Sequence, residues 1–309
     1  MTEKPDTLGL IGCGRWGRHI LRDLKALQCK VIVLAQSEQT KQSALAGQAD
    51  SVVSNYAELF AHQCDGFIVA TPTNSHLQVI QALLAAGKPI FTEKPLCNDL
   101  DDARKLLSDV SVPIYVMDKW KYHNGIIKLA ELINSGKYGK IKQLILKRTQ
   151  WGSPHQDVDP VWILLPHDIS IAQFLLGQTP KALFATGRRI QENSLNSLYA
   201  ILAANDCKVI IEVSGDAVTV ERSVSVVCEH ASFYLASAFT GQIQMQQHGV
   251  QLFGDEPVNI PFDNNMPLYA ELERFVQFLD DPSVELHSSL TEGFETVQLI
   301  SQLRNMVSD

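Results

Sequence analysis

The chain has 309 residues, of which 45% are apolar and 19% charged, a globular balance long enough for two domains. The formal net charge is -8 and no block of Lys and Arg occurs, which excludes the basic face typical of nucleic-acid-binding proteins. Binding of a small anionic ligand remains compatible with this negative net charge, because backbone amides can outweigh it locally.

No signal-peptide pattern is present, and no stretch approaches the ~20 apolar residues that cross a bilayer. The six cysteines are scattered without a CxxC pair, as is typical of reduced thiols that serve as small buried side chains: Cys13, Cys29, Cys64, Cys97, Cys207 and Cys228. We therefore expect a cytoplasmic protein without a membrane partner. The group His155, Asp157 and Asp159 could hold a metal ion, but a polar loop is favoured and no metal is expected.

In the first third of the chain, short apolar runs alternate with stretches of helical period. The runs are TLGLIG, KVIVLA, DSVV, DGFIVA, KPIFT and VPIYVM. The helical stretches are 16–27, 38–46, 56–62, 76–86 and 100–110. Such alternation predicts βαβ units and a parallel sheet covered on both faces.

The pattern changes after about residue 120. Helices are predicted at 124–135, 160–176, 267–279 and 290–306, and a strand at 140–151. Residues 180–262 are mostly strands separated by turns. We expect an α/β protein in which a doubly wound, parallel Rossmann domain (1–120) precedes an α+β domain (121–309) with a large, open, mostly antiparallel sheet.

A glycine-rich turn follows the first predicted strand and opens the first helix. In this context a G-x-G-x-x-G pattern indicates dinucleotide binding: one glycine permits a tight turn, the next lets backbone approach a pyrophosphate, and the third lets helix and strand pack closely. The amides at the helix N-terminus then face the phosphates. The residues are Gly12, Cys13, Gly14, Arg15, Trp16 and Gly17.

The end of the second predicted strand bears on the choice of cofactor. An NAD-binding fold usually has Asp or Glu there to bind the ribose hydroxyls, whereas this chain has Gln36 and Ser37. Neutral side chains do not repel a 2′-phosphate, and Arg15 or Lys41 could pair with one. The sequence therefore favours NADP, or the use of both cofactors, although Lys41 is also typical of a solvated helix charge.

Two polar turns follow the fourth and fifth predicted strands, at the edge where an open parallel sheet binds ligands. The first contains Thr71, Pro72, Asn74, Ser75 and His76; the second contains Glu93 and Lys94 before Pro95. Asn74 or Ser75 is expected to cap the next helix. His76 is compatible either with a helix surface or with the cofactor site, and Pro95 biases Lys94 toward extended backbone.

The segments LIGCGRWG, ATPTNSHLQVIQALLAAGKPIFTEKPLC and LINSGKYGKI, in that order, resemble the Gfo/Idh/MocA family of NAD(P)-dependent oxidoreductases. The resemblance implies hydride transfer between a nicotinamide and a hydroxyl or keto carbon of a sugar, nucleotide sugar or polyol. It implies that Lys94 is the active-site lysine, with Glu93 orienting it. A lysine ammonium there would stabilise negative charge on a reacting oxygen.

The segment VWILLPHDISIAQFLLG resembles the second catalytic segment of the same family, and the match places His167 at the proton-exchanging histidine. Many relatives have an aspartate four residues earlier, where this chain has Ile163. Asp168 points about 100° away on an ideal helix and is a poor replacement. The departure puts close similarity to inositol dehydrogenase in doubt.

Further substrate contacts are implied for Lys121, Tyr122 and Trp162, for which surface charge or core packing are the alternatives. Family members commonly pair their second-domain sheets, so we expect a homodimer or homotetramer through that sheet. Two other functions remain open. One is a dinucleotide-binding regulator without turnover, which Ile163 mildly favours; the other is an imine or tetrapyrrole reductase on the same scaffold.

Overall fold

The computed structural model describes residues 6–153, 158–192, 194–237, 240–249 and 256–307. The chain divides into two compact units, of which the first comprises Met1–Lys119 and Met266–Val297 and the second Trp120–Asn265 and Gln298–Asp309. Residues 266–297 thus return to the first unit, whereas the sequence suggested one boundary near residue 120. The domain limits 1–120 and 121–309 remain a prediction.

The first unit is built on a parallel sheet of six strands in the order β3-β2-β1-β4-β5-β6. This is the doubly wound dinucleotide-binding order, which reverses direction between β1 and β4 and leaves a crevice at their carboxyl ends. The strands are β1 Thr7–Ile11, β2 Lys30–Leu34, β3 Ser51–Val53, β4 Gly66–Val69, β5 Ile90–Glu93 and β6 Ile114–Met117. The predicted alternation of strands and helices is therefore confirmed.

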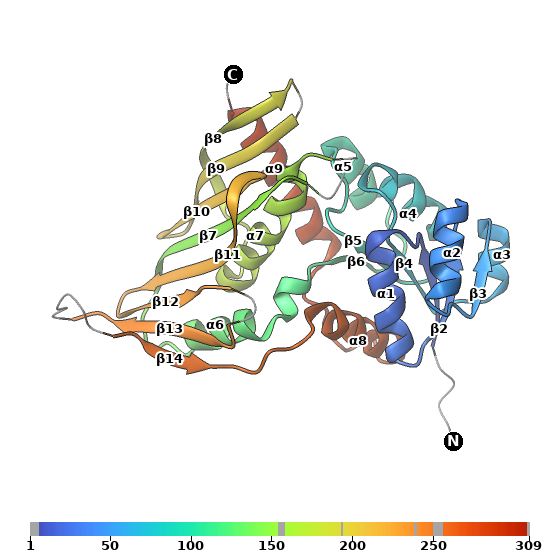
Figure 1. The fold of residues 1–309 in the computed structure, drawn as a ribbon, viewed down its shortest axis with the longest axis horizontal. Helices are drawn as coiled ribbons and strands as arrows, with labels where there is room; N and C mark the ends of the chain where they lie inside the picture. Colours follow the sequence, from blue (N-terminus) through green and yellow to red (C-terminus); the bar gives the residue numbers. More distant parts are fainter. Residues whose placement is uncertain (1–5, 154–157, 193, 238–239, 250–255, 308–309) are drawn as a thin grey trace. The chain divides into compact units, whose positions relative to one another are not determined.

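Helices pack around this sheet in two groups, one in which α1 contacts α2 and α8 and one in which α4 contacts α5 (Figure 1). The helices are α1 Arg15–Ala26, α2 Glu38–Ala46, α3 Tyr56–Ala61, α4 His76–Leu84, α5 Leu100–Ser108 and α8 Pro267–Asp280. In α1, one apolar face is buried at Ile20, Leu21 and Leu24, as 3.6-residue periodicity requires.

The last third of the chain contributes α8 to the core of the first unit. Phe275 of α8 is fully buried, and its ring centroid lies 4.8 Å from that of Phe91 in β5. Leu272 is also fully buried in the same apolar cluster. The strand that ends at Glu93 thus packs against a helix that lies nearly 180 residues later in the sequence.

The second unit contains an eight-stranded sheet in the order β14-β13-β12-β11-β7-β10-β9-β8, antiparallel except for the β7–β10 pair. Its strands are β7 Ile141–Trp151, β8 Lys181–Gln191, β9 Ser194–Ala204, β10 Cys207–Ser214, β11 Asp216–Cys228, β12 Ala231–Leu235, β13 Gln242–Gln247 and β14 Val258–Pro261. The predicted fold class, a parallel sheet plus a mostly antiparallel sheet, is confirmed.

Neighbouring rows of side chains point to opposite faces of this sheet, as the strand period of two dictates. One row, in register across six strands, is buried: Ala185, Ala200, Ile211, Leu146, Val224 and Leu235. Helix α7, Pro160–Leu176, packs on β7, β9 and β10 (Figure 1). The next row faces outward and is largely apolar, with Phe184 55% exposed beside Ile201 at 42%.

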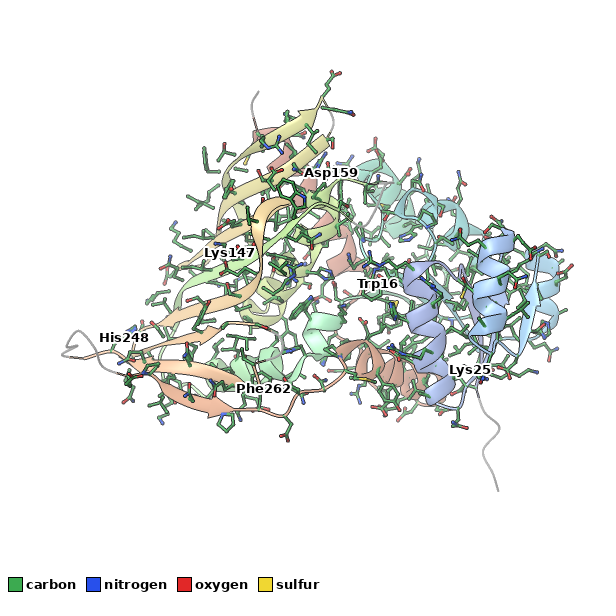
Figure 2. All side chains as sticks on the ribbon, in the orientation of Figure 1. Trp16, Lys25, Lys147, Asp159, His248 and Phe262 are labelled. Atoms are coloured by element: carbon green, nitrogen blue, oxygen red, sulfur yellow. The ribbon has the colours of Figure 1, made fainter. Side chains whose placement is uncertain are left out.

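Helix α7 begins at a capping aspartate and ends at a glycine. Asp159 is labelled in Figure 2. Its Oδ1 accepts a hydrogen bond from the amide of Trp162 at 3.1 Å, and its Oδ2 lies 2.8 Å from Nη1 of Arg304. Gly177 ends the helix in the left-handed conformation, with φ +66°. Asp159 thus has a structural role; His155 and Asp157 lie outside the described residues.

Two further helices and two short 3₁₀ segments complete the described chain. They are α6 Asn124–Asn134, α9 Leu290–Met306, η1 Thr73–Ser75 and η2 Lys119–Tyr122. All six cysteines are free and buried, as expected of small apolar side chains.

Candidate functional site

The glycine turn has the geometry that its three glycines predict. Gly12 has φ +90°, a conformation that side-chain-bearing residues rarely adopt. A Cβ on Gly17 would lie 2.4 Å from the carbonyl oxygen of Gly12, so helix and strand approach as closely as a glycine allows. A Cβ on Gly14 would meet no atom within 4 Å. The space beside Gly14 is therefore open to a ligand.

A cavity of about 610 Å³ opens at the carboxyl ends of β1, β2 and β4, large enough for part of a dinucleotide. It is lined by Ile11, Gly12, Gly14, Leu34, Gln36, Ser37, Thr40, Tyr56, Ala70, Thr71, Pro72, Ser75, Gln78 and Val79. No charged side chain is among these lining residues. Backbone amides at the N-terminus of α1 are the positive groups that the turn offers to a phosphate.

Six of the residues predicted to bind the cofactor line this cavity: Gly12, Gly14, Gln36, Ser37, Thr71 and Pro72. The other eight do not: Cys13, Arg15, Trp16, Gly17, Asn74, His76, Glu93 and Lys94. Cys13 is fully buried and Asn74 is exposed. Three polar residues that line the cavity, Thr40, Tyr56 and Gln78, were not predicted, because helix periodicity does not show which side chains face a loop of another element.

The start of α2 bears directly on this cavity. Ser37 Oγ accepts the amide of Thr40 at 3.2 Å, and Thr40 Oγ1 accepts the amide of Ser37 at 3.2 Å, a reciprocal capping box. The two hydroxyl groups lie 2.9 Å apart. Both residues line the cavity, so the helix cap also fixes the polar groups where the ribose end of a dinucleotide would lie.

The turn after β4 is held by its own side chains. Ser75 is the N-cap of α4, as one of the two predicted alternatives, but its side chain makes no bond to the helix amides. Instead Ser75 Oγ donates to Thr71 Oγ1 at 2.9 Å and to the carbonyl of Pro72 at 2.7 Å. The expected capping hydrogen bond is therefore replaced by bonds that tighten the turn.

His76 is 1% exposed, so the helix-surface alternative is wrong. Its Nδ1 lies 3.0 Å from the carbonyl oxygen of Pro95 and 3.2 Å from that of Leu96. Its Nε2 lies 3.0 Å from the carbonyl oxygen of Thr71. The ring therefore connects the turn after β4 to the segment after β5.

Lys94 follows β5 and is partly buried, and its amide donates to Glu93 Oε2 at 3.1 Å. The bond from Lys94 to Pro95 is cis.

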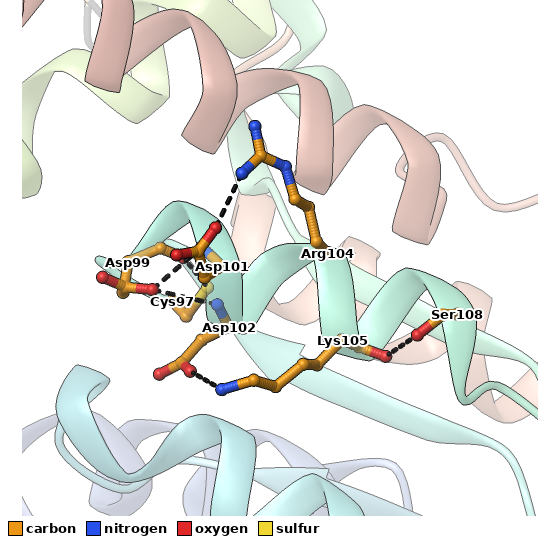
Figure 3. Close-up of polar contacts among 7 residues, drawn as sticks. All are labelled: Cys97, Asp99, Asp101, Asp102, Arg104, Lys105 and Ser108. Carbon is orange, nitrogen blue, oxygen red and sulfur yellow. Dashed lines mark hydrogen bonds and ion pairs between the residues drawn. The ribbon is translucent and has the colours of Figure 1, made fainter.

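Helix α5, which follows this segment, is capped by Asp99, whose side chain accepts hydrogen bonds from the amides of Asp101 and Asp102, both at 2.9 Å (Figure 3). Exposed ion pairs Asp101–Arg104 and Asp102–Lys105 extend along α5 and fix little beyond the helix itself.

Several charged side chains of the first unit interact with Glu93, the neighbour of Lys94. Glu271 of α8 is 1% exposed; burial, then Glu93 and Asp118, raise its pKa well above the usual range, while Lys119 opposes the shift. Burial also raises the pKa of Glu93, against the effect of Lys94 and Lys119. The ammonium of Lys119 lies 4.4 Å from the ring centroid of Trp16. Glu271 was absent from the sequence analysis because a helix pattern does not identify its packing partner.

In the second unit, the ring of His167 lies beside the indole of Trp120, which in turn contacts the guanidinium of Arg148. The indole of Trp120 lies edge-on to the imidazole of His167, with centroids 6.4 Å apart, and the guanidinium of Arg148 lies 4.6 Å from the indole centroid. Arg148 binds the buried carboxylate of Asp168. Asp168 is therefore committed to Arg148, and Ile163 is buried.

The three residues suggested for substrate contact are all buried. Lys121 is 0% exposed, so the alternative of an ordinary surface charge is wrong. Tyr122 accepts a hydrogen bond from Asn265 through its backbone carbonyl, at 2.8 Å. Trp162 is 6% exposed with the guanidinium of Arg304 5.5 Å from its ring, an arrangement that favours core packing over ligand contact.

No described helix is both long and apolar enough to span a membrane. Nor do three or more His, Cys, Asp or Glu side chains gather in the described residues as a metal ion would require.

Two family models match the chain. Residues 7–110 match the oxidoreductase family with an NAD-binding Rossmann fold, and residues 126–256 match the GFO/IDH/MocA C-terminal domain. A myo-inositol dehydrogenase of Streptomyces leeuwenhoekii is 28% identical over 191 residues, which are 59% of this chain and 59% of that protein. The matched stretch thus spans little more than half of that relative.

Solved structures share the fold over almost the whole chain. A UDP-N-acetylglucosamine 3-dehydrogenase of Acidithiobacillus ferrooxidans superposes with a TM-score of 0.83 at 17% identity and covers 98% of both chains. An oxidoreductase of Agrobacterium radiobacter, in complex with NAD+, L-tartaric acid and magnesium, superposes with a TM-score of 0.84 at 16% identity, over 98% and 96% of the chains. Because both of its domains match models of this family, the chain belongs to the GFO/IDH/MocA oxidoreductase family.

Proposed function

We propose that this protein is an NAD(P)-dependent oxidoreductase acting on a hydroxyl or keto carbon of a sugar, nucleotide sugar or polyol. The observation that supports it best is the open space at Gly14, beside a cavity at the β1–β4 crevice of a Rossmann sheet. Two of the proteins similar to this chain are a myo-inositol dehydrogenase and a UDP-N-acetylglucosamine 3-dehydrogenase.

The residues of this chain would divide the work as follows. The α1 amides and Gly14 bind the pyrophosphate, and Ser37 and Thr40 bind the adenosine ribose. A bound nicotinamide supplies or accepts the hydride at C4. Lys94 stabilises the charge that develops on the substrate oxygen, and His167 takes the hydroxyl proton in oxidation or returns it in reduction.

We infer that the protein uses both NAD and NADP. The residues that line the cavity include no carboxylate to bind the ribose hydroxyls of NAD and no cation to bind the 2′-phosphate of NADP. Gln36 and Ser37 bond either group as neutral donors and acceptors. The affinity for the two cofactors should then differ by less than about tenfold, a difference of ~1.4 kcal/mol.

We further propose a cytoplasmic homo-oligomer paired through the outward face of the eight-stranded sheet. A row of side chains crosses that face in register and includes Phe184, Ile201, Ile210, Ile145 and Tyr234. Leaving such a row in water is unfavourable, and a second copy would cover it. Sedimentation of the wild type and of Ile201→Glu tests this: a monomeric wild type contradicts it.

Turnover on a panel of polyols, sugars and nucleotide sugars tests the proposed activity, with both cofactors and with Lys94→Ala and His167→Ala beside the wild type. Turnover by the wild type, lost by about a hundredfold or more in each variant, is the expected result. Unchanged rates in both variants would overturn the roles of these residues. Cofactor binding without turnover on any substrate would instead favour the regulator.

A further inference from the structure

His76 stands between two loops that the proposed reaction needs. Its Nε2 faces the carbonyl oxygen of Thr71, which lines the cofactor cavity. Its Nδ1 faces the carbonyl oxygens of Pro95 and Leu96, directly after Lys94. Carbonyl oxygens only accept hydrogen bonds, and a neutral imidazole carries one N–H. The ring therefore donates to both loops at once when each of its nitrogens carries a proton.

The two loops differ in what else holds them. The Thr71 turn has internal bonds from Ser75 to Thr71 and to Pro72. In the Lys94 segment, the Lys94 amide bonds to the side chain of its neighbour Glu93, and Pro95 has no amide to donate. The Nδ1 contact therefore fixes the Lys94 segment to a different element, the first residue of α4.

We propose that His76 is a positioning residue that acts on two loops separately. Its Nδ1 holds the backbone after Lys94, and so the ammonium at the reacting oxygen; its Nε2 holds Thr71, and so the wall of the cofactor cavity. This inference rests on the proposed function of Lys94. Burial of the ring makes both contacts rigid, because no water competes for the carbonyl groups.

Two near-isosteric variants separate the contacts. The amide nitrogen of asparagine occupies roughly the place of Nδ1, and that of glutamine the place of Nε2. His76→Asn should therefore keep the bond to Pro95 and lose the bond to Thr71, and His76→Gln should do the reverse. His62→Gln, at the partly buried C-cap of α3, is the matched control away from both loops.

The expected pattern is a split between kcat and cofactor affinity. His76→Gln lowers kcat by about tenfold to a hundredfold, because a displacement of about 1 Å at a reacting group costs about that much, and leaves the Kd for NADH or NADPH near the wild-type value. His76→Asn weakens that Kd, measured by cofactor fluorescence, and leaves kcat within about twofold. Equal responses of the two variants would reveal a merely structural role and overturn the proposal.

Hydrogen exchange gives a readout that needs no turnover. Amides of residues 93–98 should exchange faster in His76→Gln than in the wild type, His76→Asn or the control, without cofactor present. Unchanged exchange in His76→Gln would contradict the proposal. Wild-type turnover in Lys94→Ala would instead refute the proposed role of Lys94, and with it the inference that His76 positions this lysine. Loss of turnover there, together with wild-type kcat in His76→Gln, would refute only the role of His76.

Discussion

Asp168 binds Arg148 through a single carboxylate oxygen, which accepts Nε at 3.0 Å and Nη2 at 2.9 Å. Both side chains are buried, and Arg222 stands directly opposite Arg148 on the neighbouring strand. Like charges in opposite positions destabilise a sheet, so one carboxylate here compensates two guanidinium groups. Burial and the charge of Arg148 lower the pKa of Arg222 to about 10.

Removing this carboxylate should cost far more stability than removing a surface one. We expect Asp168→Asn to lower the free energy of unfolding by about 3 kcal/mol or more, because it leaves buried charge without a counter-ion. Glu131→Gln, which breaks the exposed pair with Lys128, should change it by less than ~1 kcal/mol. Urea denaturation measures both, and similar losses in the two variants would contradict this account.

The glycine turn offers a second matched pair. Gly14→Ala adds a methyl group that meets no protein atom within 4 Å, so stability should stay within ~0.5 kcal/mol while cofactor affinity falls by about tenfold or more. Gly17→Ala forces a contact with the Gly12 carbonyl and should lower stability by about 1–3 kcal/mol. Thermal unfolding and fluorescence titration distinguish the two. Wild-type affinity in Gly14→Ala would place the pyrophosphate elsewhere.

Glu271 should make stability fall as pH rises. Its pKa is raised in the folded protein by burial and by Glu93. Below the unfolded pKa near 4.5 both states are protonated and the group contributes nothing. Above it the unfolded state ionises first, so the free energy of unfolding falls, by at most ~1.4 kcal/mol per pH unit, until the folded pKa is passed.

Glu271→Gln should remove this contribution, since a glutamine stays neutral. Its free energy of unfolding should match that of the wild type below about pH 4.5 and exceed it at pH 7. Denaturation curves at several pH values measure the difference, with the exposed Glu285→Gln as control. A difference that does not grow with pH would show that the Glu271 carboxyl ionises normally.

Cofactor preference should respond to one charge at the end of β2. Gln36→Asp supplies a carboxylate that binds the ribose hydroxyls of NAD and repels the 2′-phosphate of NADP. We expect the ratio of the two Kd values to move toward NAD by about tenfold or more. Gln39→Asp adds the same charge at a residue that does not line the cavity and should leave the ratio unchanged. A change of the Kd ratio in both variants would mean that the added charge acts on the cofactor at long range and not through contact in the cavity.

The sequence predicted most of the first unit because its signals are local. The period of two or 3.6 residues defines each strand and helix, and Gly12 and Gly17 act within their own turn. The contacts of His76 and Glu271 depend on which segments, distant in the sequence, pack against each other. Local sequence patterns do not predict such tertiary contacts. The burial of Lys121 could not be predicted for a related reason: lysine is rarely buried without a partner, and its surroundings come from the tertiary fold.

Helix α8 has a consequence for how the chain matures on the ribosome. The parallel sheet is complete at Met117, but Phe91 gains its aromatic partner Phe275 only when α8 has been synthesised. During translation the nascent sheet would expose this apolar surface while about 150 further residues are made. The first unit therefore reaches its final packing late, and a fragment truncated after residue 120 should associate with chaperones rather than accumulate as a folded cofactor-binding module.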